Sequence, residues 1–191
     1  MPKRTDLRVV KTRKAIRTAF IDLLSEKGYA AITVQDILDR ALINRKTFYN
    51  HYHDKRSLLL ELGAEAEGIV QRAFDRRMED LAGKNGFWEL VNSTYAQLYE
   101  DRSLFLALWD VRAEGLDLSA DLANKMHIAY LGMSSESPST QSEREFQAKL
   151  WATLAMEALH ELLASGRPFD ARWVQAQIEE MLETVAGATD R

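Results

Sequence analysis

The chain has 191 residues, 46% of them hydrophobic, with no cysteine and no apolar run of the ~20 residues that cross a membrane, so disulfides, thiolate metal sites and a membrane partner are excluded. Its net charge of −4 is unevenly divided, because residues 1–56 carry thirteen basic and six acidic side chains, a net of +7, and residues 57–191 carry a net of −11. This asymmetry favours a protein that docks one end on a polyanion and keeps the other end in solution.

A first helix is predicted over residues 11–27. Gly28 follows it, at the place where a helix C-terminal cap is expected. The apolar residues of this helix recur on one stripe: Ala15, Ile16, Ala19, Phe20, Leu23 and Leu24. We expect this helix to brace the two short helices that follow.

Residues 33–58 combine two short helices, a tight turn and several hydrogen-bond donors, which is the layout of a DNA-reading helix-turn-helix. Thr33 and Asp36 have capping-box spacing for the first helix, and Asn44 is a suitable N-cap for the second. Phe48 and Tyr52 lie four residues apart and form the inner face of the second helix. The remaining faces carry groups that can reach base edges or phosphates: Arg45, Lys46, Thr47, Tyr49, Asn50 and His51.

The rest of the chain has helical periodicity throughout. A long pattern from residue 54 to about 81 contains no proline, so the small domain is expected to continue rigidly into the larger one. Further helices are predicted over residues 87–100, 103–114, 119–133, 143–165 and 170–186, with an irregular segment at 134–142. We therefore predict an all-helical chain with no strand and no internal repeat.

The first ~60 residues resemble the DNA-binding domain of the tetracycline-repressor (TetR) family of transcriptional regulators. The matching stretches are RKAIRTAFIDLLSEKGY, the T-x-x-D-I start of the second helix, and FYNHYHDKRSLL. The resemblance implies that Asn44, Arg45, Lys46 and Thr47 reach into the major groove. It also implies phosphate contacts for Tyr49, His51 and Lys55, and places Thr33 where a helix start abuts the DNA backbone.

One position departs from the family pattern. The family usually has glycine in the turn between the two reading helices, where φ is positive, and this chain has Leu42. A β-carbon in a left-handed conformation costs on the order of 1 kcal/mol, which surrounding packing can offset. We therefore expect Leu42 to affect the angle of the second helix of the helix-turn-helix, which reads the DNA.

The middle of the chain concentrates aromatic and thioether side chains with a few polar groups. Such a set can line an apolar pocket for a small-molecule effector, and it is equally typical of ordinary core. The candidate ligand-binding residues are Trp88, Tyr95, Phe105, Trp109, Met126, His127 and Tyr130. Release of DNA on ligand binding is implied by the resemblance alone.

The last two predicted helices carry broad apolar stripes, and small alanines would let a partner helix approach closely. We interpret them as half of a four-helix bundle between two subunits. The candidate dimer-interface residues are Leu150, Trp151, Leu154, Ala158, Leu162, Val174, Ile178, Met181 and Val185.

The sequence thus predicts an all-α protein with a helix-turn-helix domain at 1–56, including a basic N-terminal arm, and a helical effector-binding and dimerisation domain at 57–191. Its partners are expected to be double-stranded operator DNA, a small-molecule effector and a second copy of itself, in the cytoplasm and with no metal or cofactor. Repression is the default expectation and activation the alternative. A helical enzyme or a protein-binding adaptor belongs to another class, and the chain has no GxxxxGK[ST], HExxH or GxSxG motif that would favour an enzyme.

Overall fold

A computed structural model describes residues 7–80, 95–135, 137–167 and 170–188. These residues form helices α1 (Leu7–Ala31), α2 (Val34–Ala41), α3 (Arg45–Tyr49), α4 (Lys55–Asp80), α6 (Arg102–Trp109), α7 (Leu118–Met133), α8 (Gln141–Ser165) and α9 (Ala171–Ala188). Residues 95–100 are also helical. The predicted all-helical class is confirmed, since the described ranges contain no strand.

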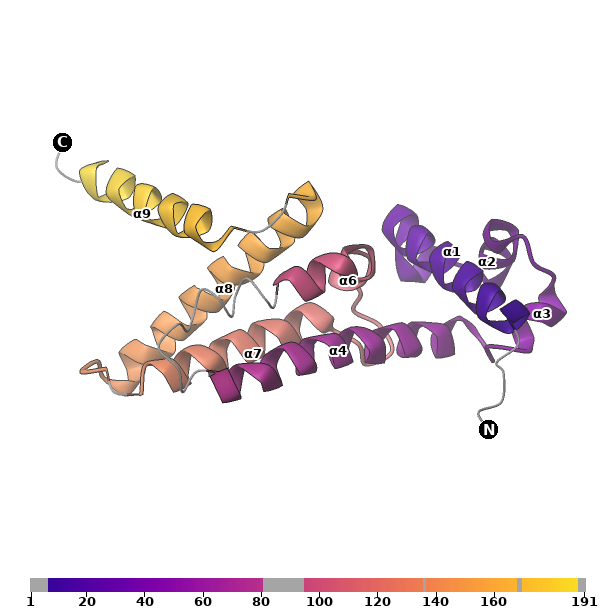
Figure 1. Cartoon of the computed structure of the whole chain (residues 1–191), viewed down its shortest axis with the longest axis horizontal. Coiled ribbons are helices and arrows are strands. Elements are labelled where there is room, and N and C mark those ends of the chain that lie inside the picture. Colours follow the sequence, from indigo (N-terminus) through magenta and orange to yellow (C-terminus); the bar gives the residue numbers. More distant parts are fainter. Residues whose placement is uncertain (1–6, 81–94, 136, 168–169, 189–191) are drawn as a thin grey trace.

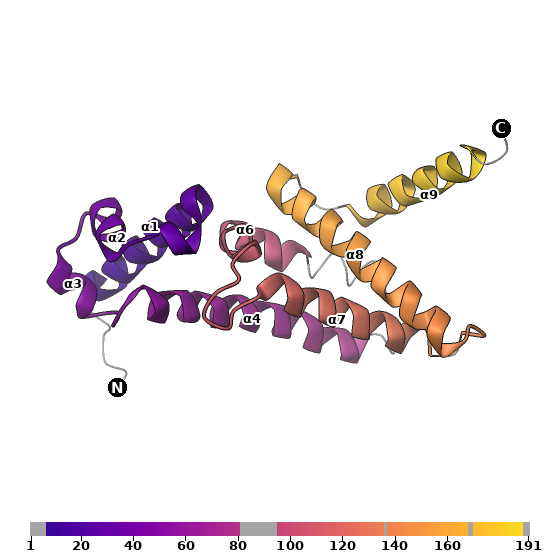
Figure 2. The same ribbon diagram turned by 180° about the vertical axis from the view of Figure 1, so that it is seen from behind.

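The helices divide into a small group and a long body (Figure 1). The small group is α1, α2 and α3, which lie together at one end of α4. The other end of α4 runs beside α7, and α8 crosses α7 with many contacts. α9 continues from α8, makes few contacts with the other described helices and extends away from them (Figure 2).

Several predicted helix boundaries change. The first helix extends from Leu7 to Ala31, and Gly28 (φ 72°, ψ 160°) interrupts it rather than ending it. The helix predicted at 103–114 stops at Trp109, because a tight turn at residues 113–116 follows. α8 begins two residues early, inside the segment predicted as irregular, because Thr140 and Glu143 form a capping box. Residues 87–94 of the predicted helix 87–100 lie outside the described ranges.

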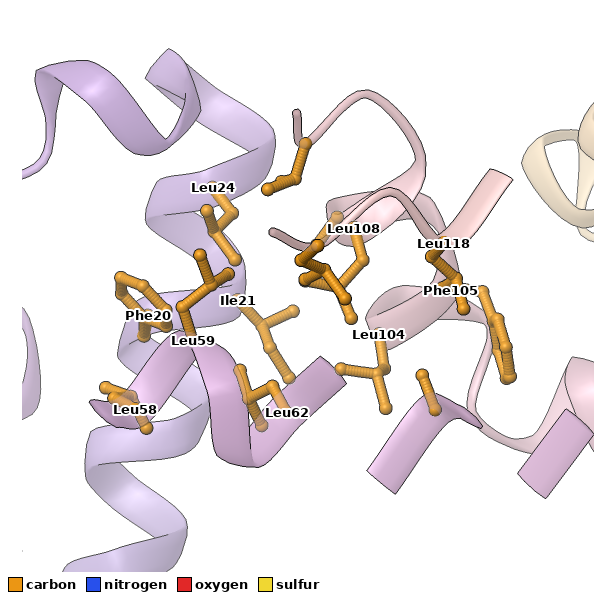
Figure 3. Packing of buried hydrophobic residues seen from close by; sticks show 14 of the residues in the cluster. Phe20, Ile21, Leu24, Leu58, Leu59, Leu62, Leu104, Phe105, Leu108 and Leu118 are labelled. Carbon is orange, nitrogen blue, oxygen red and sulfur yellow. The ribbon is translucent and has the colours of Figure 1, made fainter. Parts of the chain in front are cut away.

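One hydrophobic core joins the two groups of helices (Figure 3). Phe20, Ile21 and Leu24 of α1 face Leu58, Leu59 and Leu62 of α4, and the same cluster continues into α6. The residues of that continuation include Leu104, Phe105, Leu108 and, at the start of α7, Leu118. The core therefore continues across the predicted boundary at residues 56 and 57, and α4 belongs to both predicted domains.

Candidate DNA-binding surface

The start of α2 is fixed by side-chain hydrogen bonds. The backbone N–H of Asp36 donates to Thr33 Oγ1 (3.2 Å), and the backbone N–H of Thr33 donates to Asp36 Oδ2 (2.7 Å), as the predicted capping box requires. Lys27 Nζ lies 2.8 Å from the same carboxylate oxygen. The Lys27 ammonium, followed by the Thr33 hydroxyl and N–H, holds the pKa of Asp36 far below its ordinary value. The helix start that is expected to abut the DNA backbone is thus locally rigid.

The turn between α2 and α3 passes through Leu42. This residue adopts the left-handed conformation (φ 54°, ψ 45°), as the resemblance implies for its position. Its N–H and that of Ile43 both donate to the carbonyl oxygen of Leu38 and close the end of α2. The Leu42 side chain is 91% exposed, so side-chain packing offsets little of the backbone cost. α3 is nevertheless formed after this turn.

Asn44 begins α3 as predicted. Its Oδ1 accepts from the backbone N–H of Thr47 (2.8 Å) and from the Thr47 hydroxyl (2.9 Å), so these atoms serve the cap. Arg45 and Lys46 are exposed on the first turn of α3. Arg45 Nη2 donates to Gln35 Oε1 (3.0 Å), which sets the arginine against α2. Sequence reasoning missed Gln35, and the available signal was its polar side chain in the first turn of α2, two residues after the N-cap Thr33.

The other side of α3 anchors it to the core. Phe48 is fully buried and Tyr52 nearly so, which confirms the predicted inner face. Tyr49 lies outside with 49% exposure, and its ring packs at right angles on Phe48, with centroids 5.5 Å apart. Asn50 is exposed, and His51 is half-buried. Tyr49 and Asn50 therefore present their polar ends to solvent beside Arg45 and Lys46.

Lys55 has a different environment from the one expected of a phosphate contact. Its Nζ donates to the carbonyl oxygens of Tyr29 (3.0 Å) and Ile32 (2.7 Å), and it lies 4.4 Å from the centroid of the Tyr29 ring. The ammonium thus satisfies carbonyls at the end of α1. Two of its three donors therefore already serve the fold, and a phosphate contact by Lys55 stays a prediction that rests on the third donor.

The predicted effector residues pack as core and as helix contacts. Tyr95 is 4% exposed and its hydroxyl donates to two backbone carbonyls, and Phe105 is fully buried. The Trp109 ring lies against His160, with centroids 4.9 Å apart. On α7, Met126 is half-buried, His127 pairs with Glu145 (3.0 Å) and the Tyr130 hydroxyl donates to Gln147 (3.2 Å). Trp88 lies outside the described residues, and effector binding by this set remains a prediction.

Most of the predicted dimer residues are accessible. Leu150, Leu154, Met181 and Val185 are 51%, 47%, 44% and 63% exposed, although they are large and apolar. Ala158 is exposed as well, and Trp151, Val174 and Ile178 are half-buried. Leu162 is the exception and is removed from the set, because it is 8% exposed and belongs to the core of its own chain.

Within the described residues, no group of histidine and acidic side chains has the arrangement of a metal site. In the same ranges, no helix is long and apolar enough to cross a membrane.

Residues 16–62 match the family model described as bacterial regulatory proteins, tetR family. Over 58 residues the chain is 52% identical to the uncharacterized HTH-type transcriptional regulator YxbF of Bacillus subtilis, an alignment that covers 30% of this chain and 15% of that protein. Over 48 residues it is 44% identical to the HTH-type dhaKLM operon transcriptional activator DhaS of Lactococcus lactis, which covers 25% of this chain and 26% of that protein. These alignments therefore span 15% and 26% of the two relatives' lengths.

Among solved structures, a dihydroxyacetone kinase operon activator DhaS aligns over 91% of this chain and 94% of its own, with 19% identity and a TM-score of 0.47. The family match falls on α1 to α4, where the structure places the capping box, the left-handed turn and the exposed α3. The N-terminal domain of this chain therefore belongs to the tetR family of bacterial regulatory proteins.

Proposed function

We propose that this regulator binds a palindromic DNA operator as a homodimer and that a small molecule releases it. The observation that carries the proposal is the exposed surface of α3, where Arg45, Lys46, Tyr49 and Asn50 project from a helix whose opposite side is anchored by Phe48. A short helix with these side chains fits a major groove, and arginine and lysine pair with guanine there. The net charge of +7 over residues 1–56 supports approach to DNA by this end.

The homodimer is supported by the apolar surface of α8 and α9. These helices expose Leu150, Leu154, Met181 and Val185, and α9 has few contacts with the other described helices. A large exposed apolar surface on a helix favours association. The partner that we propose for this surface is a second copy of the chain, because each copy would then bind one half-site of a two-fold symmetric operator.

Repression is the default mode that we propose, and activation is a second candidate with a specific observation behind it. DhaS of Lactococcus lactis, to which the chain is 44% identical over 48 residues, is described as an activator. The sign of regulation depends on where the operator lies relative to the promoter. A reporter gene placed behind the selected operator would separate the two, since loss of the regulator raises expression under repression and lowers it under activation.

Selection of DNA from a random pool with the purified protein tests the proposal. The expected result is an enriched sequence with two inverted half-sites whose centres lie roughly 34–36 Å apart. Recovery of no sequence preference would contradict the proposed function. An enriched site with no inverted symmetry would contradict the homodimer and leave DNA recognition standing.

A further inference from the structure

The turn between α6 and α7 has an unusual residue, Glu114, at its first central position. Ala113 and Leu116 exchange backbone hydrogen bonds (3.3 and 2.9 Å), and the two residues between them, Glu114 and Gly115, have φ of 57° and 83°. Positive φ at both central positions is the pattern of a type I′ turn, which prefers asparagine and glycine. Glutamate in this conformation costs on the order of 1 kcal/mol. Its presence therefore calls for a role outside the turn itself.

The turn is held tightly on α4. Leu116 is 5% exposed and packs on Gly63, where an added β-carbon would lie 2.7 Å from Leu116 Cδ1. The core described above also joins α1 to α6, the helix that precedes the turn. The position of Glu114 relative to α4 is thus well determined.

The carboxylate of Glu114 reaches one residue of α1 and one residue at the start of α4. Its Oε2 accepts from Arg56 Nε (2.7 Å) on the first turn of α4, and its Oε1 accepts from the Tyr29 hydroxyl (3.3 Å) beyond the break in α1. Burial and the nearby Glu114 carboxylate raise the pKa of Tyr29, so its hydroxyl keeps the proton that it donates.

Tyr29 connects this contact to the reading helices. Its carbonyl oxygen and that of Ile32 receive the Lys55 ammonium, and Thr33, which caps α2, follows directly. A single carboxylate on the body therefore contacts the segment that leads into α2 and the helix that follows α3.

We propose that Glu114 is a positioning residue that fixes the orientation of the α1–α3 group on the body for operator recognition. This proposal rests on the proposed DNA-binding function. An exposed ion pair contributes little to the free energy of unfolding, and the Arg56 and Glu114 side chains are 57% and 35% exposed. Its effect falls instead on orientation, because two reading helices bind together only when both are held at the spacing of successive major grooves.

Glu114→Asn separates positioning from stability. Asparagine is the better residue for the turn, so the melting temperature is expected to stay equal or rise, while the shorter neutral side chain loses the contacts to Tyr29 and Arg56. The expected result is operator affinity weakened by ~5-fold or more, the lower range of typical coupling effects. Charge alone predicts the opposite, since removing a carboxylate strengthens attraction to DNA.

Glu65→Gln is the matched control. Glu65 pairs with Arg17 between α4 and α1, has a similar side-chain exposure of 39%, and belongs to a link that does not involve the turn between α6 and α7. Glu65→Gln removes one negative charge, as Glu114→Asn does, so operator affinity is expected to stay equal or rise slightly. Equal weakening by both substitutions would overturn the assignment of positioning to Glu114.

A double-mutant cycle identifies the partner. Tyr29→Phe removes only the hydroxyl, and its effect on operator affinity is expected to disappear in the Glu114→Asn background. The slope of log affinity against log salt is expected to match wild type in both variants, because no phosphate contact is lost. Unchanged or tighter operator binding by Glu114→Asn would overturn the proposal, as would additive effects. If the wild-type protein preferred no DNA sequence, the proposed function itself would be contradicted. The selection experiment would show this before any variant is made.

Discussion

The two ends of the molecule differ in how much of their apolar surface is buried within a single chain. At the reading end, α2 and α3 bury Ile37, Leu38 and Phe48 and turn mainly polar groups outward. At the far end, α9 exposes Leu182 at 59% and Val185 at 63% and makes few contacts with the other described helices. The reading helices are thus supported within one chain, whereas the far end has apolar surface without a partner. The predictions below test that difference.

The largest effect is expected from a charge placed in the proposed dimer surface. Met181→Glu should give monomers, because a carboxylate desolvated between two apolar helices costs several kcal/mol. Monomers hold only one reading helix, so operator affinity should fall by about 100-fold or more. Sedimentation and gel-shift titration measure the two quantities.

Ala176→Glu is the control for this change, since it adds the same charge on α9 about 140° around the helix from Met181. It is expected to leave a dimer with wild-type affinity. A wild-type protein that sediments as a monomer at micromolar concentration would remove the contrast between the two ends.

The second prediction concerns base readout. Arg45→Ala should relax specificity at one position of each half-site by ~1–3 kcal/mol, because a bidentate contact to guanine would be lost. Tyr49→Phe removes an expected phosphate contact and should weaken binding on all sequences alike. Competition binding with single-base operator variants distinguishes the two patterns. Equal losses on operator and random DNA for both variants would contradict this division of roles.

The reading end was largely predictable from the sequence, because its determinants are local. Thr33 with Asp36 and Asn44 with Thr47 lie three residues apart, and the hydrogen bonds that they form depend on that spacing alone. The positive φ of Leu42 was likewise expected from its place in the turn. Periodicity also gave the existence of most helices, and their ends shifted where caps such as Thr140 were not recognised.

Contacts between distant residues could not be predicted in this way. The resemblance implied a phosphate contact for Lys55, yet the carbonyl oxygens of Tyr29 and Ile32, more than twenty residues earlier, accept hydrogen bonds from its ammonium. Glu114 lies 58 residues from Arg56, and no local pattern marks that pair. Leu162 shares its stripe with exposed residues of α8, and only the packing of the body shows that it faces inward.

The third prediction follows from the new role of Lys55. Lys55→Met keeps the aliphatic stem and removes the ammonium, so the carbonyl oxygens of Tyr29 and Ile32 lose its hydrogen bonds. The free energy of unfolding should fall by ~1–3 kcal/mol, the usual range for hydrogen bonds from a charged group. Urea denaturation gives this value. An unchanged stability together with a smaller salt slope in DNA binding would instead favour the predicted phosphate contact.

The fourth prediction concerns the turn before α3. Leu42→Gly should raise the free energy of unfolding by up to ~1 kcal/mol, because glycine adopts positive φ without the β-carbon penalty and the exposed leucine loses little packing. Leu42→Ala keeps the β-carbon and should not show this gain. Urea denaturation of both variants decides the matter, and a less stable glycine variant would show that the leucine side chain contributes to the fold.

The smallest effect is a pH dependence at the start of α2. Because the pKa of Asp36 is lowered in the folded protein, its ionised form stabilises the fold at pH values above the ordinary carboxyl range, and this contribution is lost as pH falls through the folded pKa. The stability gap between wild type and Asp36→Asn should therefore be constant from pH 7 to about 5 and shrink below ~4, the pKa of an unperturbed aspartate. Urea denaturation of both proteins across this range measures the gap. A gap that widens toward acid pH would mean that the Lys27 and Thr33 contacts do not stabilise the carboxylate, and that the capping box acts without its charge.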